Sequence, residues 1–222
     1  MTEPDFLRTT RAFYDAVADD YADHFRDVLA SRPLDRSLLA CFAELVRADG
    51  AGPVADLGCG PGLVTAHLAA LGLSVFGVDL SPRMVAHARR EHPGVRFEEG
   101  AMTSLDLPDG SLGGVVAWYS IIHTPQERLP ELFAEFHRLL APGGHLLVAF
   151  QTGDEPLHVA QPFGHPVSLD FQRRQPDRIA GLAAAAGLAV RARMLREPDE
   201  ELGDTAPQAC LMIRKPAAAA RS

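Results

Sequence analysis

Three glycines at alternate positions, Gly58, Gly60 and Gly62, follow a short apolar run and precede a segment with helical spacing of apolar residues. Glycine lets the backbone adopt positive φ, and it lets a ligand approach the main chain with no Cβ in the way. The run before the glycines, VADL, has the length and composition of a buried parallel strand. The pattern therefore predicts a ligand-binding turn between a strand and the N-terminus of a helix.

The residue types around this turn limit the ligand that it could hold. Asp56 stands before the first glycine, where its carboxylate would repel a pyrophosphate. No lysine follows the glycines, so the spacing of a P-loop is missing as well. An adenosine joined to a cationic amine fits better than a phosphate ester, and S-adenosylmethionine (SAM) has that make-up.

A second acidic residue, Asp79, ends the next strand-like run, twenty-one positions after Gly58. A carboxylate at about this offset accepts hydrogen bonds from both hydroxyls of a ribose bound on a glycine turn. The alternative is a local role at the start of a helix, before Ser81 and Pro82. The two roles are compatible with each other.

The elements that must position these residues alternate between strands and helices. The patterns predict strands at 53–57, 74–78, 95–98, 114–118 and 145–150, and helices at 62–72, 82–91 and 127–140. An amphipathic helix or kinked helix pair at 6–29 and a helix ending at 49–50 precede them; a loop or hairpin at 151–175, a helix at 176–186 and strands at 188–195 and 208–214 follow. Such alternation is typical of a parallel sheet with helices on both faces.

Length and composition indicate one globular domain. The 222 residues suffice for one α/β core, with 47% hydrophobic and 23% charged residues. No apolar run approaches the ~18 residues of a membrane span, and the opening residues lack the pattern of a signal peptide. Cys41, Cys59 and Cys210 form no C-x-x-C pair. We therefore expect a cytoplasmic protein, and the net charge of -8 disfavours nucleic acid as a partner.

Four motifs resemble, in this order, those of the class I SAM-dependent methyltransferases, in the small-molecule branch of ubiquinone-type and natural-product enzymes. They are ADLGCGPG, GVDLSPRM, LPDGSLGGVVAWYSIIH and LLAPGGHLLVAF, and the resemblance covers roughly residues 9–214. It implies an α/β, Rossmann-like fold: a seven-stranded, mostly parallel sheet in the order 3-2-1-4-5-7-6, with strand 7 antiparallel and helices on both faces. We expect a helical cap at 1–50, a methyltransferase domain at 51–215 and a disordered tail at 216–222.

The resemblance also assigns contacts with SAM. It implies that Asp56 and the backbone of Gly58, Cys59, Gly60 and Gly62 hold the methionine end, and that Asp79 holds the ribose. The family's usual Gly-Asp in the third motif is Gly100-Ala101 here, so the backbone of Ala101 and Met102 would replace that contact with the adenine. The other expected contacts come from the N-terminal segment, from the adenine walls and from the end of the fourth strand: Tyr14, Tyr21, Leu80, Met84, Trp118 and Tyr119. For the two tyrosines, plain core packing is the alternative.

Methyl transfer from a sulfonium is an in-line displacement that needs alignment and exclusion of water, so we expect no metal. A hydroxyl or ammonium acceptor must also lose a proton, and histidine suits this near neutral pH. His123 closes AWYSIIH at the carboxyl end of the fourth strand, where open α/β sheets bind their ligands. We predict that His123 is the catalytic base; a capping or packing histidine is the alternative.

His158, His165 and Arg173 lie in the irregular segment 151–175, which in the family helps to cover the acceptor. We expect them to contact the substrate, although a solvated pair is the alternative for Arg173 and Arg174. No cysteine or acidic residue stands at the spacing that a zinc site would need.

The sequence thus predicts an enzyme that transfers a methyl group from SAM to an oxygen or nitrogen of a small molecule and releases S-adenosyl-L-homocysteine (SAH). A non-catalytic SAM-binding module and a nicotinamide-dependent oxidoreductase are alternatives; Asp56 and the lack of a Tyr-x-x-x-Lys pair disfavour the second. Methylation of RNA or protein is weaker still, because no basic stripe is present. The sequence leaves open the identity of the acceptor and whether the chain forms a homodimer.

Overall fold

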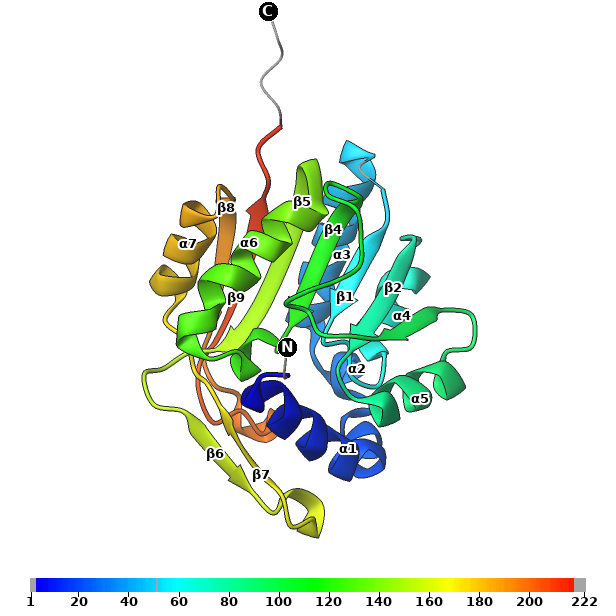
Figure 1. Cartoon of the computed structure of the whole chain (residues 1–222), viewed down its shortest axis with the longest axis vertical. Helices are drawn as coiled ribbons and strands as arrows, with labels where there is room; N and C mark the ends of the chain where they lie inside the picture. Colours follow the sequence, from blue (N-terminus) through cyan, green and yellow to red (C-terminus); the bar gives the residue numbers. More distant parts are fainter. Residues whose placement is uncertain (1–2, 51, 218–222) are drawn as a thin grey trace, which may run out of the picture.

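A seven-stranded sheet forms the centre of the computed structural model, which describes residues 3–50 and 52–217 (Figure 1). Its strand order is β3-β2-β1-β4-β5-β9-β8. The strands are β1 (Val54–Leu57), β2 (Val75–Asp79), β3 (Arg96–Glu99), β4 (Leu112–Trp118), β5 (Leu140–Gln151), β8 (Ala189–Arg196) and β9 (Gln208–Arg214). β1 to β5 are parallel, and β9 runs antiparallel to both of its neighbours. With β8 and β9 counted as strands 6 and 7, the predicted order is confirmed.

Helices cover both faces of this sheet. They are α1 (Asp5–Phe25), α2 (Val28–Ser31), α3 (Pro33–Asp49), α4 (Leu63–Ala70), α5 (Pro82–Glu91), α6 (Leu129–Leu139) and α7 (Pro176–Ala185), with short 3-10 turns η1 (Ile121–His123), η2 (Gln126–Arg128), η3 (Pro162–Gly164) and η4 (Glu200–Leu202). The predicted helix at 127–140 begins with the turn η2, and the helix ends where Leu140 enters β5. The N-terminal segment is the kinked pair α1–α2.

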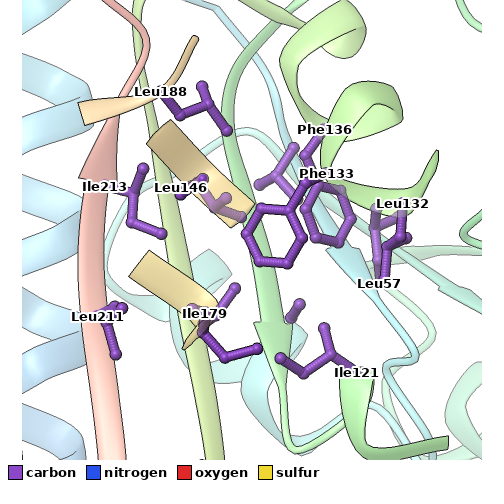
Figure 2. Close-up of a cluster of buried hydrophobic side chains, with 14 of the residues drawn as sticks. Leu57, Ile121, Leu132, Phe133, Phe136, Leu146, Ile179, Leu188, Leu211 and Ile213 are labelled. Carbon is purple, nitrogen blue, oxygen red and sulfur yellow. The ribbon is translucent and has the colours of Figure 1, made fainter. Parts of the chain in front are cut away.

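The larger core lies under α6 and α7 (Figure 2). Phe133 and Phe136 of α6 are fully buried against Leu146 of β5, with Leu211 of β9 in the same cluster. Burying a side chain of this size stabilises the fold by about 1.5–3 kcal/mol. The opposite face packs against α3 and α4, so the central strands are apolar on both sides. This explains why the strands read as short apolar runs rather than as alternating patterns.

Gly114 of β4 shows how closely α3 packs on the sheet. A Cβ at this position would lie 2.8 Å from the Phe42 ring and 3.1 Å from a Val46 methyl group. The close approach of α3 explains why glycine stands at this position. α3 therefore belongs to the layer that covers the sheet, although it lies within the segment 1–50.

α1 and a hairpin lie across the carboxyl ends of the strands (Figure 1). The hairpin pairs β6 (Leu157–Ala160) with β7 (Ser168–Phe171), within the segment predicted to be a loop or hairpin. Asp15 on α1 accepts a hydrogen bond from Ser81 Oγ (2.5 Å), and its carbonyl accepts one from Arg83 (2.9 Å), which ties α1 to α5. Among the described residues, no helix has the length and apolar character to span a membrane. The predicted tail at 216–222 lies mostly outside the described residues.

Candidate active site

A cavity of about 420 Å³ lies at the carboxyl edge of the sheet, beside α1. Open α/β sheets bind their ligands at this edge, where the strand order reverses. His123 lines the cavity. So do most of the predicted cofactor residues: Tyr14, Tyr21, Gly58, Cys59, Gly60, Asp79, Leu80, Ala101, Met102, Trp118 and Tyr119.

The glycine turn after β1 has the backbone conformation that the sequence predicted. Gly58, Gly60 and Gly62 have φ values of 75°, 53° and 88°. A Cβ on Gly58 would lie 2.4 Å from Ser120 Cβ, and one on Gly62 would lie 2.8 Å from the Phe97 ring. A Cβ on Gly60 would have no atom within 4 Å, so Gly60 leaves the space beside the cavity open. Gly62 itself does not line the cavity; it serves the packing at the start of α4 instead.

Asp79 joins the glycine turn to the end of β2. Its Oδ2 accepts a hydrogen bond from Gly60 N (2.8 Å), and its Oδ1 accepts one from Ser81 N (2.8 Å). Burial raises the pKa of Asp79, while these two backbone hydrogen bonds act in the opposite direction. Ser81 caps α5, because its Oγ accepts from Met84 N. Each carboxylate oxygen of Asp79 keeps a lone pair for a ligand in the cavity.

Asp56 and Met84 do not line the cavity, contrary to the contacts expected from the sequence. Asp56 is buried below the turn, where its Oδ2 accepts a hydrogen bond from Thr65 Oγ1 (2.6 Å). Burial raises the pKa of Asp56 to about 7. Met84 is buried on α5. Both residues support the site from behind: Asp56 holds the turn to α4, and Met84 holds α5 to the sheet.

The walls next to Asp79 suit a flat apolar ring with a polar rim. Leu80 and Met102 supply apolar surface, and Arg11 of α1 donates to the Leu80 carbonyl (3.2 Å). The Arg11 guanidinium also donates to both carboxylate oxygens of Glu3 (2.6 and 2.7 Å). Ser120 Oγ lies buried on the glycine side of the cavity with no partner among the described residues. The residues present therefore fit a ligand with a ribose, a flat base and further polar groups.

His123 forms a hydrogen-bonded pair with Tyr14. The Tyr14 hydroxyl lies 2.7 Å from His123 Nε2, and Phe171 packs edge-on against the imidazole at 5.0 Å between ring centroids. Burial, with a smaller effect of the Arg174 charge, lowers the pKa of His123 to about 3. Burial also raises the pKa of Tyr14. Both groups are therefore neutral at physiological pH, and burial of the imidazole disfavours its protonated form.

Comparison with known proteins identifies the family. Residues 54–144 match the model of a methyltransferase domain. Over 177 residues the chain is 30% identical to a demethylmenaquinone methyltransferase from Chlorobaculum parvum, and the alignment covers 78% of this chain and 70% of that protein. The chain belongs to the class I SAM-dependent methyltransferases.

Two further comparisons agree. The methyltransferase is 36% identical over 155 residues to a trans-aconitate 2-methyltransferase from Methylobacterium nodulans, covering 66% of this chain and 54% of that protein. Its fold matches the crystal structure of a magnesium protoporphyrin IX methyltransferase from Synechocystis PCC 6803 with bound SAM. That match has a TM-score of 0.70 and 16% identity, and it covers 97% and 99% of the two chains. SAM is thus the methyl donor and SAH the product.

The three residues predicted to contact the substrate do not line this cavity of the methyltransferase. His158 pairs with Asp170 across the hairpin (2.6 Å), because β6 and β7 align these two residues. His165 contacts Asp20 of α1 (2.8 Å). Arg173 Nη2 donates to Thr205 Oγ1 (3.3 Å). His158 instead lines a second, more open hollow, which it shares with His123.

Sequence reasoning missed several polar residues of the cavity: Arg11, Arg32, Asp35, Gln151, Asp204 and Gln208. They come from separate helices, strands and loops, and none stands in a motif. The one available signal was for Gln151 and Gln208, because each lies at the end of a predicted strand that would reach the ligand edge of the sheet. Among the described residues, no cluster of three or more His, Cys, Asp or Glu side chains is arranged to hold a metal ion.

Proposed function

We propose that this methyltransferase transfers the methyl group of SAM to an oxygen or nitrogen atom of a small-molecule acceptor held in the cavity beside α1. One observation carries the proposal. The glycine turn with Asp79 and the His123–Tyr14 pair line the same cavity. A donor bound on the turn and a group able to take the acceptor's proton would therefore share one enclosed space.

The proposed contacts with SAM follow from the lining residues. The backbone of Gly58, Cys59 and Gly60 and the Ser120 hydroxyl would hold the methionine end, and Asp79 would accept hydrogen bonds from the ribose hydroxyls. Leu80, Ala101 and Met102 would border the adenine, and Tyr14 and Tyr21 of α1 would cover the donor. Bound SAM supplies an electrophilic methyl group on a sulfonium. The chain binds and orients the two reactants and excludes water from them.

His123 and Tyr14 would remove the acceptor's proton together. The Tyr14 hydroxyl lines the cavity and donates to His123 Nε2 when the other ring nitrogen carries the imidazole proton. An acceptor hydroxyl that donates to Tyr14 Oη then gives up its proton as Tyr14 passes its own to Nε2. Because the imidazole is neutral throughout the physiological range, His123 Nε2 stays available as an acceptor for the Tyr14 hydroxyl at any cellular pH.

The experiment is an acceptor screen with SAM labelled in its methyl group. Phenols, amines, carboxylic acids and quinols are incubated with the purified protein, and SAH release is measured beside label transfer. Transfer to an oxygen or nitrogen is the expected result. Tight binding of SAM and SAH with no transfer to any acceptor would favour the non-catalytic module instead.

A further inference from the structure

The end of the cavity away from the glycine turn carries polar groups that the proposed function does not use. We propose that Asp35, Gln151 and Gln208 bind an amino group of the acceptor, so that the enzyme selects amine-bearing small molecules over carboxylates. The inference rests on the proposed function, because it takes the glycine turn and Asp79 as the SAM site.

The sheet order separates these groups from the SAM contacts. Gln151 ends β5 and Gln208 begins β9, and the antiparallel register places the two residues opposite each other, on one face of the sheet. β5 and β9 lie on one side of β4, whereas β1 and β2, which lead to Gly58 and Asp79, lie on the other. Both glutamines line the cavity. The cavity therefore extends from a SAM end to a second, polar end.

The two glutamines present unfilled hydrogen-bond acceptors. Gln208 is only 2% exposed, and its Nε2 donates to the Ala206 carbonyl (2.8 Å), which fixes the orientation of the amide. Its Oε1 has no partner within residues 3–50 and 52–217, and the same is true of Gln151 Oε1. An unfilled buried acceptor destabilises the fold. A ligand that supplies donor hydrogens would recover that free energy.

Asp35 adds a negative charge at this end. It lies in the first turn of α3, is 3% exposed and lines the cavity. Burial raises the pKa of Asp35, while the charges of Arg196 and Arg32 act in the opposite direction. A buried carboxylate is costly unless it is hydrogen-bonded, so it favours a cationic donor such as an ammonium group.

The two arginine side chains near this end are already paired with Asp204. Arg32 lines it too, but its guanidinium donates to Asp204 Oδ1 (3.0 Å) and to the Leu202 carbonyl (2.9 Å). Arg196 pairs with the other oxygen of Asp204. Its Nη2 has no partner but does not line the cavity. A carboxylate ligand would therefore be repelled by Asp35, whereas an ammonium would meet the oxygens of Asp35, Gln151 and Gln208.

Apolar side chains line the cavity as well. Among them are Val28 and Leu29 of α2, Val64 of α4 and Trp118 of β4. The acceptor that fits best carries an amino group on an apolar ring or chain. The same ammonium chemistry exists at the methionine end of SAM, so the test must separate the two sources.

The test uses three probes with one 4-hydroxyphenyl body: tyramine, tyrosol and 4-hydroxyphenylacetate. Each is titrated by calorimetry into the full chain saturated with SAH. Tyramine is expected to bind at least tenfold more tightly than the acid, with tyrosol between them. Asp35→Asn is expected to abolish the preference for tyramine while leaving the affinity for SAH unchanged. Asp27→Asn, an exposed neighbour on the same segment, is the matched control and should behave as the wild type does.

Three results would overturn the proposal. The first is that the wild type binds tyramine no more tightly than the other probes, or binds none of the three. The second is a preference that survives in Asp35→Asn. The third is weaker SAH binding in that variant, which would assign Asp35 to the methionine end of SAM. If Asp35→Asn fails to fold, Gln208→Leu is used in its place and should lower the affinity for tyramine several-fold.

The proposed function fails separately. If tyramine is preferred but no acceptor in the screen is methylated, only the catalytic assignment falls. If a carboxylic acid is methylated and amines show no preference, the catalytic assignment stands and the amine site falls.

Discussion

Replacing Gly58 by alanine should mainly impair folding, whereas replacing Gly60 by alanine should mainly impair binding. Both glycines have positive φ, which costs an alanine about 1–2 kcal/mol. At Gly58 the new methyl group would also lie 2.4 Å from Ser120 Cβ and 3.1 Å from the Met102 methyl group, and overpacking of this kind costs about 1–3 kcal/mol more. Gly58→Ala should therefore lower the free energy of unfolding by about 2–5 kcal/mol.

Gly60→Ala should cost only the conformational part, about 1–2 kcal/mol. Its methyl group meets no protein atom within 4 Å, since it enters the space that we assign to SAM. The affinity for SAH should then fall by at least tenfold, although the protein stays folded. Gly58→Ala, by contrast, should show its main defect in stability.

The assay pairs urea denaturation with calorimetric titration of SAH for the wild type and both variants. Gly50→Ala is the control, because Gly50 also has positive φ (59°) with no atom near its Cβ, but it ends α3 away from the cavity. Equal losses of stability in Gly58→Ala and Gly60→Ala would refute the packing argument. Unchanged SAH affinity in Gly60→Ala would refute the position assigned to SAM.

Three further predictions concern single polar groups. Asp79→Asn should lower the affinity for SAH at least tenfold, as measured by calorimetry. The amide nitrogen of the new side chain would face a backbone N–H of Gly60 or Ser81 instead of accepting from it. His123→Ala and Tyr14→Phe should each lower kcat without changing SAH affinity, and in steady-state kinetics the double variant should be no slower than the worse single one. Asp56 has a folded pKa of about 7 against 3.8 for an aspartate in water, so the folded state binds more protons in between and stability should fall as pH rises from about 4 to 7. Asp56→Asn should flatten that slope in urea titrations at each pH; an unchanged slope would mean that Asp56 is not its source.

Local motifs explain what the sequence could predict. Strand and helix positions and the glycine turn are encoded in short contiguous stretches, each of which carries its own backbone preference. The strand order, by contrast, followed from the resemblance to the methyltransferase family. Asp79 was predictable because the turn and the end of β2 must meet in any such sheet. Asp56, which the sequence places at the methionine end of SAM, does not line the cavity; Thr65, in the first turn of α4, donates to its Oδ2, and nothing before the fold is known indicates that contact.

Contacts between distant segments explain what the sequence could not predict. The hairpin register places His158 opposite Asp170, so a histidine expected at the acceptor is hydrogen-bonded to a carboxylate of the hairpin. The polar end of the cavity combines Asp35, Gln151 and Gln208, which lie on α3, β5 and β9. None of the three belongs to a motif. What they share is a side-chain oxygen at the cavity, and that arrangement exists only once the fold has brought the three elements together.

The position of Tyr14 links closure of the cavity to the chemistry inside it. Tyr14 is on α1, and its hydroxyl holds the imidazole of His123, which follows β4. α1 is tied to the rest of the fold next to the proposed adenine site, through Asp15 to Ser81 and through Arg11 to the Leu80 carbonyl. An α1 displaced from the strand ends would uncover the donor and would also leave His123 Nε2 without its partner. On the proposed function, the same helix that covers SAM would complete the proton path, so the base would be assembled only when the reactants are enclosed.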